Sequence, residues 1–228
     1  MDSRRTSHLA YEDLGARFDS FMSPYDVSRR QKLVEYFLTR IPAPEQCLET
    51  GCGTGKISDI LRDRVTQLIV SDISATLART AAERIGCDWR QENVCHLSFP
   101  DETFDVVVSS ECIEHTENPL KALAEMCRVL KPGGTLIVTT PNKLWYPILL
   151  LSQGLHIRKF TGTIENWLWP RQIVAHLRKN NMQICVIRGC HLYPWQIPFL
   201  RVFLPLFDRW SAVLWPMMIT FGVCARKQ

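Results

Sequence analysis

The sequence lacks the features that mark membrane-spanning, secreted and nucleic-acid-binding chains. Its longest apolar runs fall short of the roughly 20 residues that span a bilayer. Residues 1–18 are polar, so we expect no signal peptide. The 27 basic and 23 acidic residues give a net charge of +4. No block of basic residues occurs among them, and we therefore expect no nucleic-acid partner.

The sequence also lacks a cysteine framework. Its nine cysteines are odd in number and include no Cys-x-x-Cys pair. Several lie within apolar runs, as small buried side chains do. We therefore expect free thiols in a reducing, cytoplasmic compartment, and neither disulfide bridges nor a zinc site.

Short apolar strands alternate with helical patterns through the first two thirds of the chain. Strands are predicted at 46–50, 67–71, 87–91, 104–110 and 133–140, and helices at 28–41, 56–64, 73–85 and 118–130. This order predicts an α/β fold in which a parallel sheet is covered by helices on both faces. A later helix starts near Pro170, and strands follow at 182–190 and 217–227. The 228 residues suit one domain.

The stretch "LETGCGTGK", residues 48–56, places glycines at 51, 53 and 55 between a predicted strand and a predicted helix. A triphosphate-binding loop would need glycine at position 50 and a hydroxyl at 57, where Thr50 and Ile57 stand, so we reject that function. A dinucleotide fingerprint would need a third glycine where Lys56 stands, which weakens that alternative without excluding it.

An acidic residue, Asp72, ends the next predicted strand in "LIVSDIS". A carboxylate at this edge of the sheet can accept hydrogen bonds from both hydroxyls of a ribose. Asp72 can also act as a helix N-cap, because a helix is predicted to follow it. The two roles are compatible.

The glycine loop, Asp72 and the downstream segments "SSECIEHTENP" and "RVLKPGGTLIVTTPN" together resemble the class I S-adenosylmethionine-dependent methyltransferases. The resemblance is good over 11–142 and looser beyond. It implies a Rossmann-like fold with a mostly parallel seven-stranded sheet and an antiparallel last strand. It further implies one domain, 1–228, with an N-terminal helical lid at 1–40, a cofactor-binding core at 41–142 and a substrate-side half at 143–228. An apolar insertion is expected near 191–215. We assign the "KPGG" turn no chemistry.

By the same resemblance, S-adenosylmethionine would lie along the carboxyl edge of the sheet. The leading acid of the glycine motif would lie near the sulfonium, the loop against the methionine part and ribose, and "QENVCHLSF" against the adenine. The family usually carries Asp where Asn93 stands, and an amide oxygen can still accept a hydrogen bond from the adenine amine. The expected cofactor-binding residues are Glu49, Thr50, Gly51, Cys52, Gly53, Gly55, Asp72, Ile73, Asn93, Val94 and Glu111.

Within this superfamily, "ECIEH", "RKFTGTIENWLWP" and "GCHLYP" most resemble the ubiquinone-biosynthesis O-methyltransferases and related small-molecule enzymes. Those enzymes carry a His-Asp pair where Ile164 and Glu165 stand here. The resemblance favours an oxygen acceptor on a small hydrophobic molecule, such as a quinone-like phenol, a lipid-linked intermediate or a natural product.

The candidate catalytic residues are Glu111, Glu114 and His115, which follow the fourth strand, and His191. In one hypothesis His115 is a general base or a polar neighbour of the methionine part. In another, Glu111, Glu114 and His115 bind a divalent metal such as magnesium, like the similar motif of plant small-RNA 2′-O-methyltransferases. In a third, Glu111 touches the cofactor while Glu114 and His115 are only solvated. His191 and His156 are further candidate bases.

Two late segments are apolar and aromatic, at 144–151 and 193–210. They suit a hydrophobic acceptor, a helix lying on a membrane surface, or a helix that packs at the sheet edge. Two other functions remain open: an RNA ribose 2′-O-methyltransferase and a cofactor-binding scaffold without turnover. The expected location is the cytoplasm, with peripheral membrane contact as an alternative.

Overall fold

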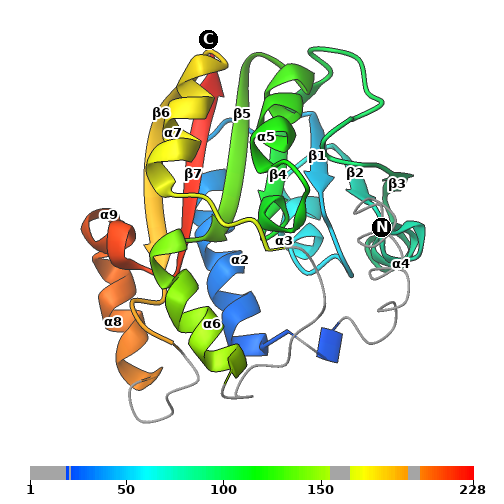
Figure 1. Cartoon of the computed structure of the whole chain (residues 1–228). Helices are drawn as coiled ribbons and strands as arrows, with labels where there is room; N and C mark the ends of the chain where they lie inside the picture. Colours follow the sequence, from blue (N-terminus) through cyan, green and yellow to red (C-terminus); the bar gives the residue numbers. More distant parts are fainter. Residues whose placement is uncertain (1–18, 21, 155–164, 195–200) are drawn as a thin grey trace.

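The computed structural model describes residues 19–20, 22–154, 165–194 and 201–228 (Figure 1). Its centre is a seven-stranded sheet with the strand order β3-β2-β1-β4-β5-β7-β6. Strand β7 runs antiparallel to both of its neighbours, β5 and β6. The four pairings among β1 to β5 are parallel. The predicted Rossmann-like fold is confirmed. The strands are β1 Gln46–Thr50, β2 Gln67–Asp72, β3 Asp88–Gln91, β4 Phe104–Ser110, β5 Leu130–Pro141, β6 Met182–Cys190 and β7 Thr220–Lys227.

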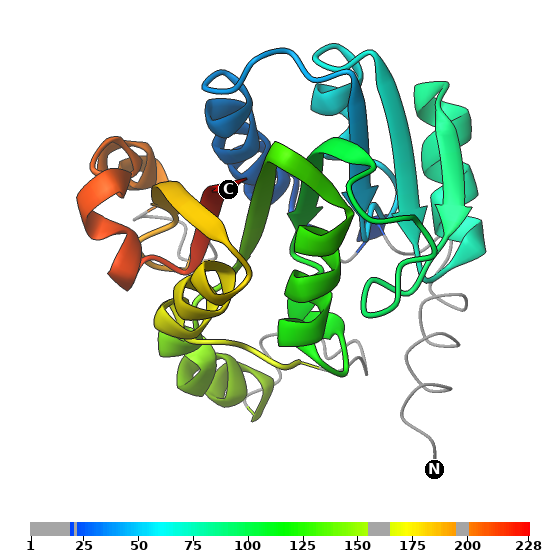
Figure 2. The same cartoon turned by 90° about the horizontal axis from the view of Figure 1, so that it is seen from above.

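Helices cover both faces of the sheet, as Figure 2 shows for α2 on one side and α5 and α7 on the other. The helices of the described residues are α2 Pro24–Leu38, α3 Ser58–Arg62, α4 Ala75–Ile85, α5 Pro119–Val129, α6 Tyr146–Gly154, α7 Pro170–Lys179, α8 Leu204–Arg209 and α9 Ser211–Leu214. Short 3₁₀ turns are η2 Ile113–His115, η3 Lys143–Trp145, η4 Arg201–Phe203 and η5 Trp215–Met217. No helix within these ranges is long and apolar enough to cross a membrane.

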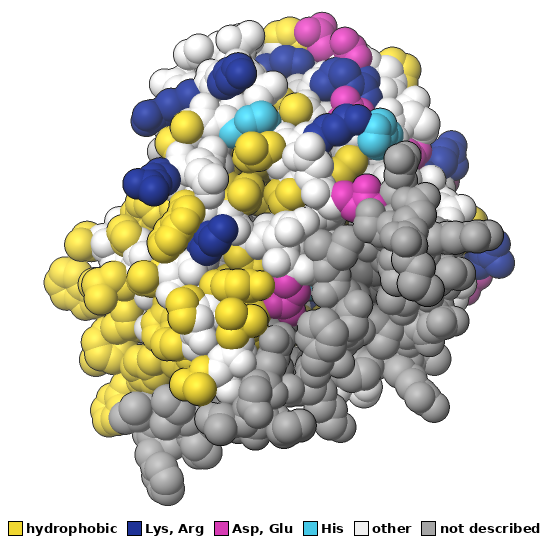
Figure 3. Space-filling view, viewed as in Figure 1, with side chains coloured by type: hydrophobic (Ala, Val, Ile, Leu, Met, Phe, Trp, Pro, Cys, Tyr) yellow, Lys and Arg dark blue, Asp and Glu magenta, His cyan; other side chains and the backbone are white. Residues whose placement is uncertain are grey.

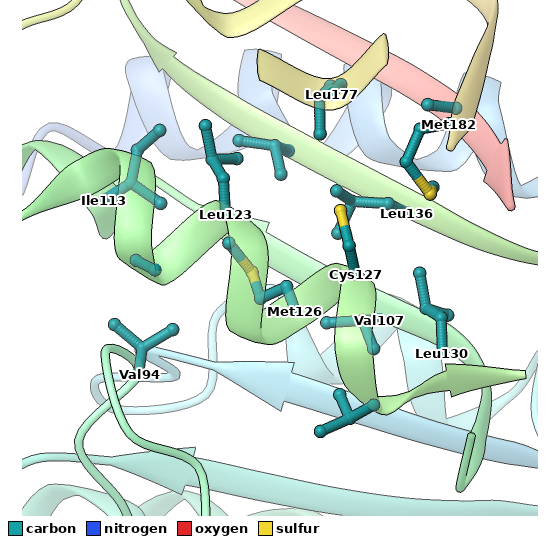
Figure 4. Close-up of a cluster of buried hydrophobic side chains, with 14 of the residues drawn as sticks. Val94, Val107, Ile113, Leu123, Met126, Cys127, Leu130, Leu136, Leu177 and Met182 are labelled. Atoms are coloured by element: carbon teal, nitrogen blue, oxygen red, sulfur yellow. The ribbon is translucent and has the colours of Figure 1, made fainter. Parts of the chain in front are cut away.

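The central strands are buried on both sides because alternate residues feed two separate apolar cores. In β4, Val107 joins the core under α5 and α7, whereas Val106 and Val108 join the core under α2 and α4. Figure 4 shows the first core, where Leu123 of α5 and Leu177 of α7 meet the sheet. These two cores fix the strand ends that carry the polar residues.

Several elements differ in extent from their predictions. The helix predicted at 28–41 is α2, Pro24–Leu38. The predicted helix 56–64 is the five-residue α3, because residues 53–57 form turns. The "KPGG" stretch lies within β5 as a bulge, since the pairing with β4 shifts from Phe104↔Leu130 to Val106↔Thr135. The last strand begins at Thr220, because residues 215–217 form η5.

Candidate functional site: the carboxyl edge of the sheet

The glycine loop leaves β1 at Thr50 and enters α3 at Ser58. Its three glycines all have positive φ, at 67° for Gly51, 53° for Gly53 and 82° for Gly55. Side chains rarely adopt this conformation, and a Cβ atom on Gly51 would also overlap the Sγ and Cβ atoms of Cys112. The loop backbone therefore lies directly against the segment that follows β4.

Asp72 holds this loop from the end of β2. Its Oδ2 atom accepts the N–H of Gly53 at 2.9 Å, and its Oδ1 atom accepts the N–H of Ser74 at 3.0 Å. The N-cap of α4 is Ser74, whose hydroxyl accepts the N–H of Leu77, so our prediction of Asp72 as the cap is wrong by two residues. A carboxylate offers about four acceptor positions. Asp72 can therefore order the loop and still meet the ribose hydroxyls predicted for it.

Two residues that hold the glycine loop in place were not predicted from the sequence. Arg84 of α4 donates to the carbonyls of Thr54 and Gly55 and bonds both carboxylate oxygens of Asp59. Asp19 accepts a hydrogen bond from Thr54 and pairs with the Nζ atom of Lys56 at 2.8 Å. No local pattern marks these residues, because their partners are 25 to 37 positions away and belong to other elements.

Glu49, the leading acid of the glycine motif, is buried at the end of β1 and accepts a hydrogen bond from the Ser58 hydroxyl. Burial, with a smaller contribution from the nearby charge of Asp72, raises the pKa of Glu49 to about 8. The carboxyl is therefore mostly protonated at neutral pH. A cationic sulfonium or ammonium group placed beside it would favour its ionised form.

The predicted adenine segment follows β3. The side chain of Asn93 is exposed, and its Oδ1 atom accepts the N–H of Cys95 at 2.9 Å. The neighbouring Val94 is buried in the core beneath α5, as Figure 4 shows. Ile73 is partly buried, and its carbonyl accepts a hydrogen bond from Gln91. These residues lie at the predicted edge, and their contact with adenine stays a prediction.

Glu111 and Glu114, the acidic pair, follow the end of β4. Glu111 has a φ of 52°, and its Oε1 atom accepts the hydroxyl of Thr139 at 3.2 Å. Glu114 is almost fully buried, and its Oε2 atom accepts the hydroxyl of Thr140 at 2.9 Å. Burial and the charge of Glu114 hold the pKa of Glu111 well above its usual value, and burial raises the pKa of Glu114 to about 7.

A second group of polar residues lies near the acidic pair. Asp26 and Arg30 belong to α2, and His191 directly follows β6. His191, which is fully buried with a φ of 62°, contacts Oδ1 of Asp26 through Nε2 at 3.0 Å. Asp26 Oδ2 pairs with Arg30 at 2.8 Å. Although burial alone would lower it, the carboxylates of Asp26, Glu111 and Glu114 raise the pKa of Arg30. The guanidinium thus supplies positive charge to the acidic pair.

His115 lies in η2, directly after Glu114, and is partly exposed. Among the described residues, no three His, Cys, Asp or Glu side chains are arranged to hold a metal ion. The metal-binding role of Glu111, Glu114 and His115 stays a prediction, as does the role of His115 as a base. The candidate base His156 lies outside the described residues.

The structure thus brings most of the predicted residues to one edge. Asp72 is the last residue of β2, and the glycine loop, the acidic pair and His191 follow the carboxyl ends of β1, β4 and β6. This is where open α/β sheets bind their ligands. Sequence reasoning missed Asp26, whose contact with His191 spans 165 positions.

Comparison with known proteins identifies methyltransferases as similar proteins. Residues 48–138 match the methyltransferase domain family. The chain is 36% identical over 119 residues to a probable S-adenosylmethionine-dependent methyltransferase of Mycolicibacterium smegmatis. The match covers 52% of this chain and 46% of that protein, so the chain spans about half the length of that relative. It is 26% identical over 175 residues to the ubiquinone biosynthesis O-methyltransferase of Xanthomonas campestris pv. campestris, covering 72% of this chain and 73% of that protein.

Among solved structures, the N-methyltransferase NodS of Bradyrhizobium japonicum, in complex with S-adenosylhomocysteine, superposes with a TM-score of 0.70. It is 16% identical, and the alignment covers 97% of this chain and 98% of NodS. Residues 48–138 thus form a methyltransferase domain, and these similarities support a class I S-adenosylmethionine-dependent methyltransferase with S-adenosylmethionine as its cofactor. The residues fit this cofactor, because alternate positions of the loop are glycines with positive φ and the carboxylate of Asp72 stands beside Gly53.

Proposed function

We propose that this protein transfers a methyl group from S-adenosylmethionine to an oxygen atom of a small hydrophobic acceptor. The bound cofactor supplies an electrophilic methyl group, which needs an aligned nucleophile rather than covalent help from the protein. Gly51, Gly53 and Asp72 would hold the cofactor. A hydroxyl acceptor additionally needs a group that takes its proton.

The observation that carries the proposal is the contact between Gly51 and Cys112. Cys112 follows Glu111 directly, so the packing of Gly51 on Cys112 brings the acidic pair next to the cofactor loop. The pKa of Glu114, at about 7, suits a group that accepts a proton near neutral pH. Because the two carboxyls interact, their proton affinities belong to the pair rather than to either residue. We assign the pair the role of receiving the acceptor's proton.

Arg30 and His191 would influence how readily the acidic pair binds a proton. The positive charge of Arg30 favours the ionised form of the carboxyls, whereas burial opposes it. Asp26 holds both Arg30 and His191, so the charge balance depends on the placement of α2. The similarity to the Xanthomonas ubiquinone biosynthesis O-methyltransferase supports a phenolic oxygen as the acceptor. The apolar segments 144–151 and 201–217 support a hydrophobic one.

The test is a transfer assay with methyl-labelled S-adenosylmethionine and a catechol that bears a long alkyl chain. We expect the label to partition into the organic phase. Glu114→Gln should lower the rate at least about 100-fold, while its affinity for S-adenosylhomocysteine stays within about twofold. Glu83→Gln, at an exposed position of α4, is the matched control and should retain the rate.

Three outcomes would contradict the proposal. Label that stays in the aqueous phase and is released by nuclease, when cellular RNA is supplied, would favour ribose methylation. Binding of S-adenosylhomocysteine without transfer to the catechol or to any component of a cell extract would favour the scaffold. Loss of activity with EDTA would assign the proton transfer to a metal-bound group and would support the metal-binding role of Glu111, Glu114 and His115.

A further inference from the structure

Large apolar side chains are exposed together on two late segments of the chain. On the segment from η4 to η5 they are Val202, Phe203, Leu206, Trp210, Val213 and Met217. On η3 and α6 they are Leu144, Ile148, Leu150 and Leu151. Figure 3 shows hydrophobic side chains gathered over the region of α6, α8 and α9. We call these ten side chains the apolar face. A soluble surface rarely exposes so many bulky apolar groups in one region.

Two hydrogen bonds join these two segments. The indole Nε1 of Trp145 donates to the carbonyl of Met217 at 2.9 Å, which links η3 to η5. Asn142 donates to the carbonyl of Pro216 at 2.8 Å. The apolar face is therefore one surface built from two parts of the chain.

The opposite side of the segment from α8 to η5 is packed against the protein. Leu204 and Met218 are fully buried, and Ser211 accepts a hydrogen bond from Arg188 at 3.1 Å. Asp208 pairs with Arg29 of α2 and accepts the N–H of His191 at 3.1 Å. The segment is thus fixed in place while Val213 and Trp210 remain 71% and 63% exposed. The apolar face is preformed, so binding through it needs no folding step.

Basic residues outnumber acidic residues on the two stretches that carry the apolar face. The stretches 143–154 and 201–217 contain a single acidic residue, Asp208, whose side chain is only 8% exposed and is neutralised by Arg29. Lys143 and Arg209 lie on the same stretches, and neither forms an ion pair with another described residue. An apolar surface with unneutralised basic groups complements a bilayer that contains anionic lipids.

The apolar face also adjoins the proposed acceptor site. Segment α6 follows the carboxyl end of β5, and the segment from η4 to η5 lies between the end of β6 and the start of β7. These strand ends belong to the edge that carries the acidic pair and His191. A lipophilic molecule in a bilayer would therefore be close to the site.

We propose that this protein binds the surface of an anionic lipid bilayer through the apolar face, as a peripheral protein. Apolar side chains of α6, α8 and α9 enter the headgroup region, and Lys143 and Arg209 contact lipid phosphates. This proposal does not depend on the identity of the acceptor, because binding is measured without substrate.

The experiment is sedimentation of the full chain with two kinds of vesicle. One contains phosphatidylcholine alone, and the other also contains about 30% phosphatidylglycerol, which is on the order of the anionic lipid content of natural membranes. We expect binding to the mixed vesicles and at least tenfold weaker partition to phosphatidylcholine alone. Trp210→Glu with Val213→Glu, and separately Leu150→Glu with Leu151→Glu, should each lower the partition at least tenfold. Lys143→Gln with Arg209→Gln should lower it several-fold and reduce its salt dependence.

The matched control adds the same negative charge elsewhere. Thr66→Glu with Thr80→Glu changes two exposed residues, one before β2 and one on α4, and should leave vesicle binding within twofold of the unchanged protein. All variants should keep the helical circular dichroism and melting temperature of the parent, since Lys143 is partly exposed and the other altered side chains are exposed.

Two results would overturn the proposal. One is equal binding by the control and the apolar-face variants, which would make the effect one of net charge. The other is absence of vesicle binding together with a dimer in analytical ultracentrifugation that Trp210→Glu with Val213→Glu converts to a monomer. That second result would assign the apolar face to another copy of the chain.

Discussion

The Nε2 atom of His191 lies 3.0 Å from Oδ1 of Asp26, and this contact joins the end of β6 to the first turn of α2. The other oxygen of Asp26 pairs with Arg30 one turn later, at 2.8 Å. Although burial alone would raise it, the hydrogen bond with His191 and the charge of Arg30 lower the pKa of Asp26. A charged group from α2 is therefore held in the interior, close to the acidic pair.

We predict that Asp26→Ala destabilises the protein by about 3 kcal/mol, because it leaves the buried guanidinium of Arg30 without its nearest carboxylate. Urea unfolding followed by circular dichroism measures this change. Glu35→Ala is the control on the same helix, since Glu35 pairs with Arg64 at 3.2 Å and both side chains are more than 40% exposed. That exposed pair should contribute less than about 1 kcal/mol. Equal losses in the two variants would show that burial of the Asp26 pair has no energetic consequence.

The sheet could be predicted because its signals are local. The apolar strands at 46–50, 104–110 and 182–190 match β1, β4 and β6 residue for residue. The glycine loop and Asp72 were found for the same reason, since conformation and chemistry there need particular residues at short spacing. Local periodicity also placed α7, which begins at Pro170 as predicted.

The contacts that complete the site could not be predicted, because they join distant parts of the chain. Nothing near Asp26 indicates His191, and nothing near Thr54 indicates Arg84 or Asp19. The packing of Gly51 on Cys112 likewise depends on the tertiary pairing of β1 with β4. These relationships follow from the sheet order, which the sequence pattern alone leaves open.

The fit between Gly51 and Cys112 gives a second prediction. Gly51→Ala should destabilise the protein by about 2 to 4 kcal/mol, because the new Cβ atom combines a left-handed backbone with a steric overlap. Thermal and urea unfolding measure the loss.

Gly86→Ala is the matched control for Gly51→Ala. Gly86 has a φ of 78°, but nothing lies within 4 Å of a Cβ placed on it. Its substitution should cost about 1 kcal/mol, from the backbone conformation alone. Similar losses for the two variants would mean that Cys112 moves aside without cost, and would weaken the link between the cofactor loop and the acidic pair.

Asp72 provides a prediction for cofactor affinity. Asp72→Ala removes the acceptor for the Gly53 amide at 2.9 Å and the acceptor proposed for the ribose hydroxyls. We expect binding of S-adenosylhomocysteine to weaken by about 10- to 100-fold, since hydrogen bonds to charged groups contribute about 1.5 to 3 kcal/mol each. Isothermal titration calorimetry measures the affinity.

Asp88→Ala is the control for Asp72→Ala, because Asp88 is an exposed carboxylate at the opposite, amino end of the adjoining strand β3. Its affinity should match that of the unchanged protein. An unaltered affinity in Asp72→Ala would remove this residue from the cofactor site and leave it only the ordering of the loop.

The buried carboxyl of Glu49 predicts how stability depends on pH. Its pKa, raised to about 8 in the folded protein, is near 4.5 in the unfolded chain. Between these values the folded state binds more protons than the unfolded state, so stability falls as the pH rises. At about 1.4 kcal/mol for each pKa unit, the loss amounts to at most about 5 kcal/mol.

Glu49→Gln should remove this part of the pH dependence, because the amide cannot ionise but still accepts the hydrogen bond from Ser58. Unfolding by urea at intervals from pH 5 to 9, without cofactor, should therefore show a shallower decline in the variant. Glu83→Gln, at an exposed position of α4, should retain the decline of the parent. Parallel curves for Glu49→Gln and the parent would show that Glu49 is ionised throughout this range. In that case a negative charge would already stand at the end of β1 before the cationic cofactor binds.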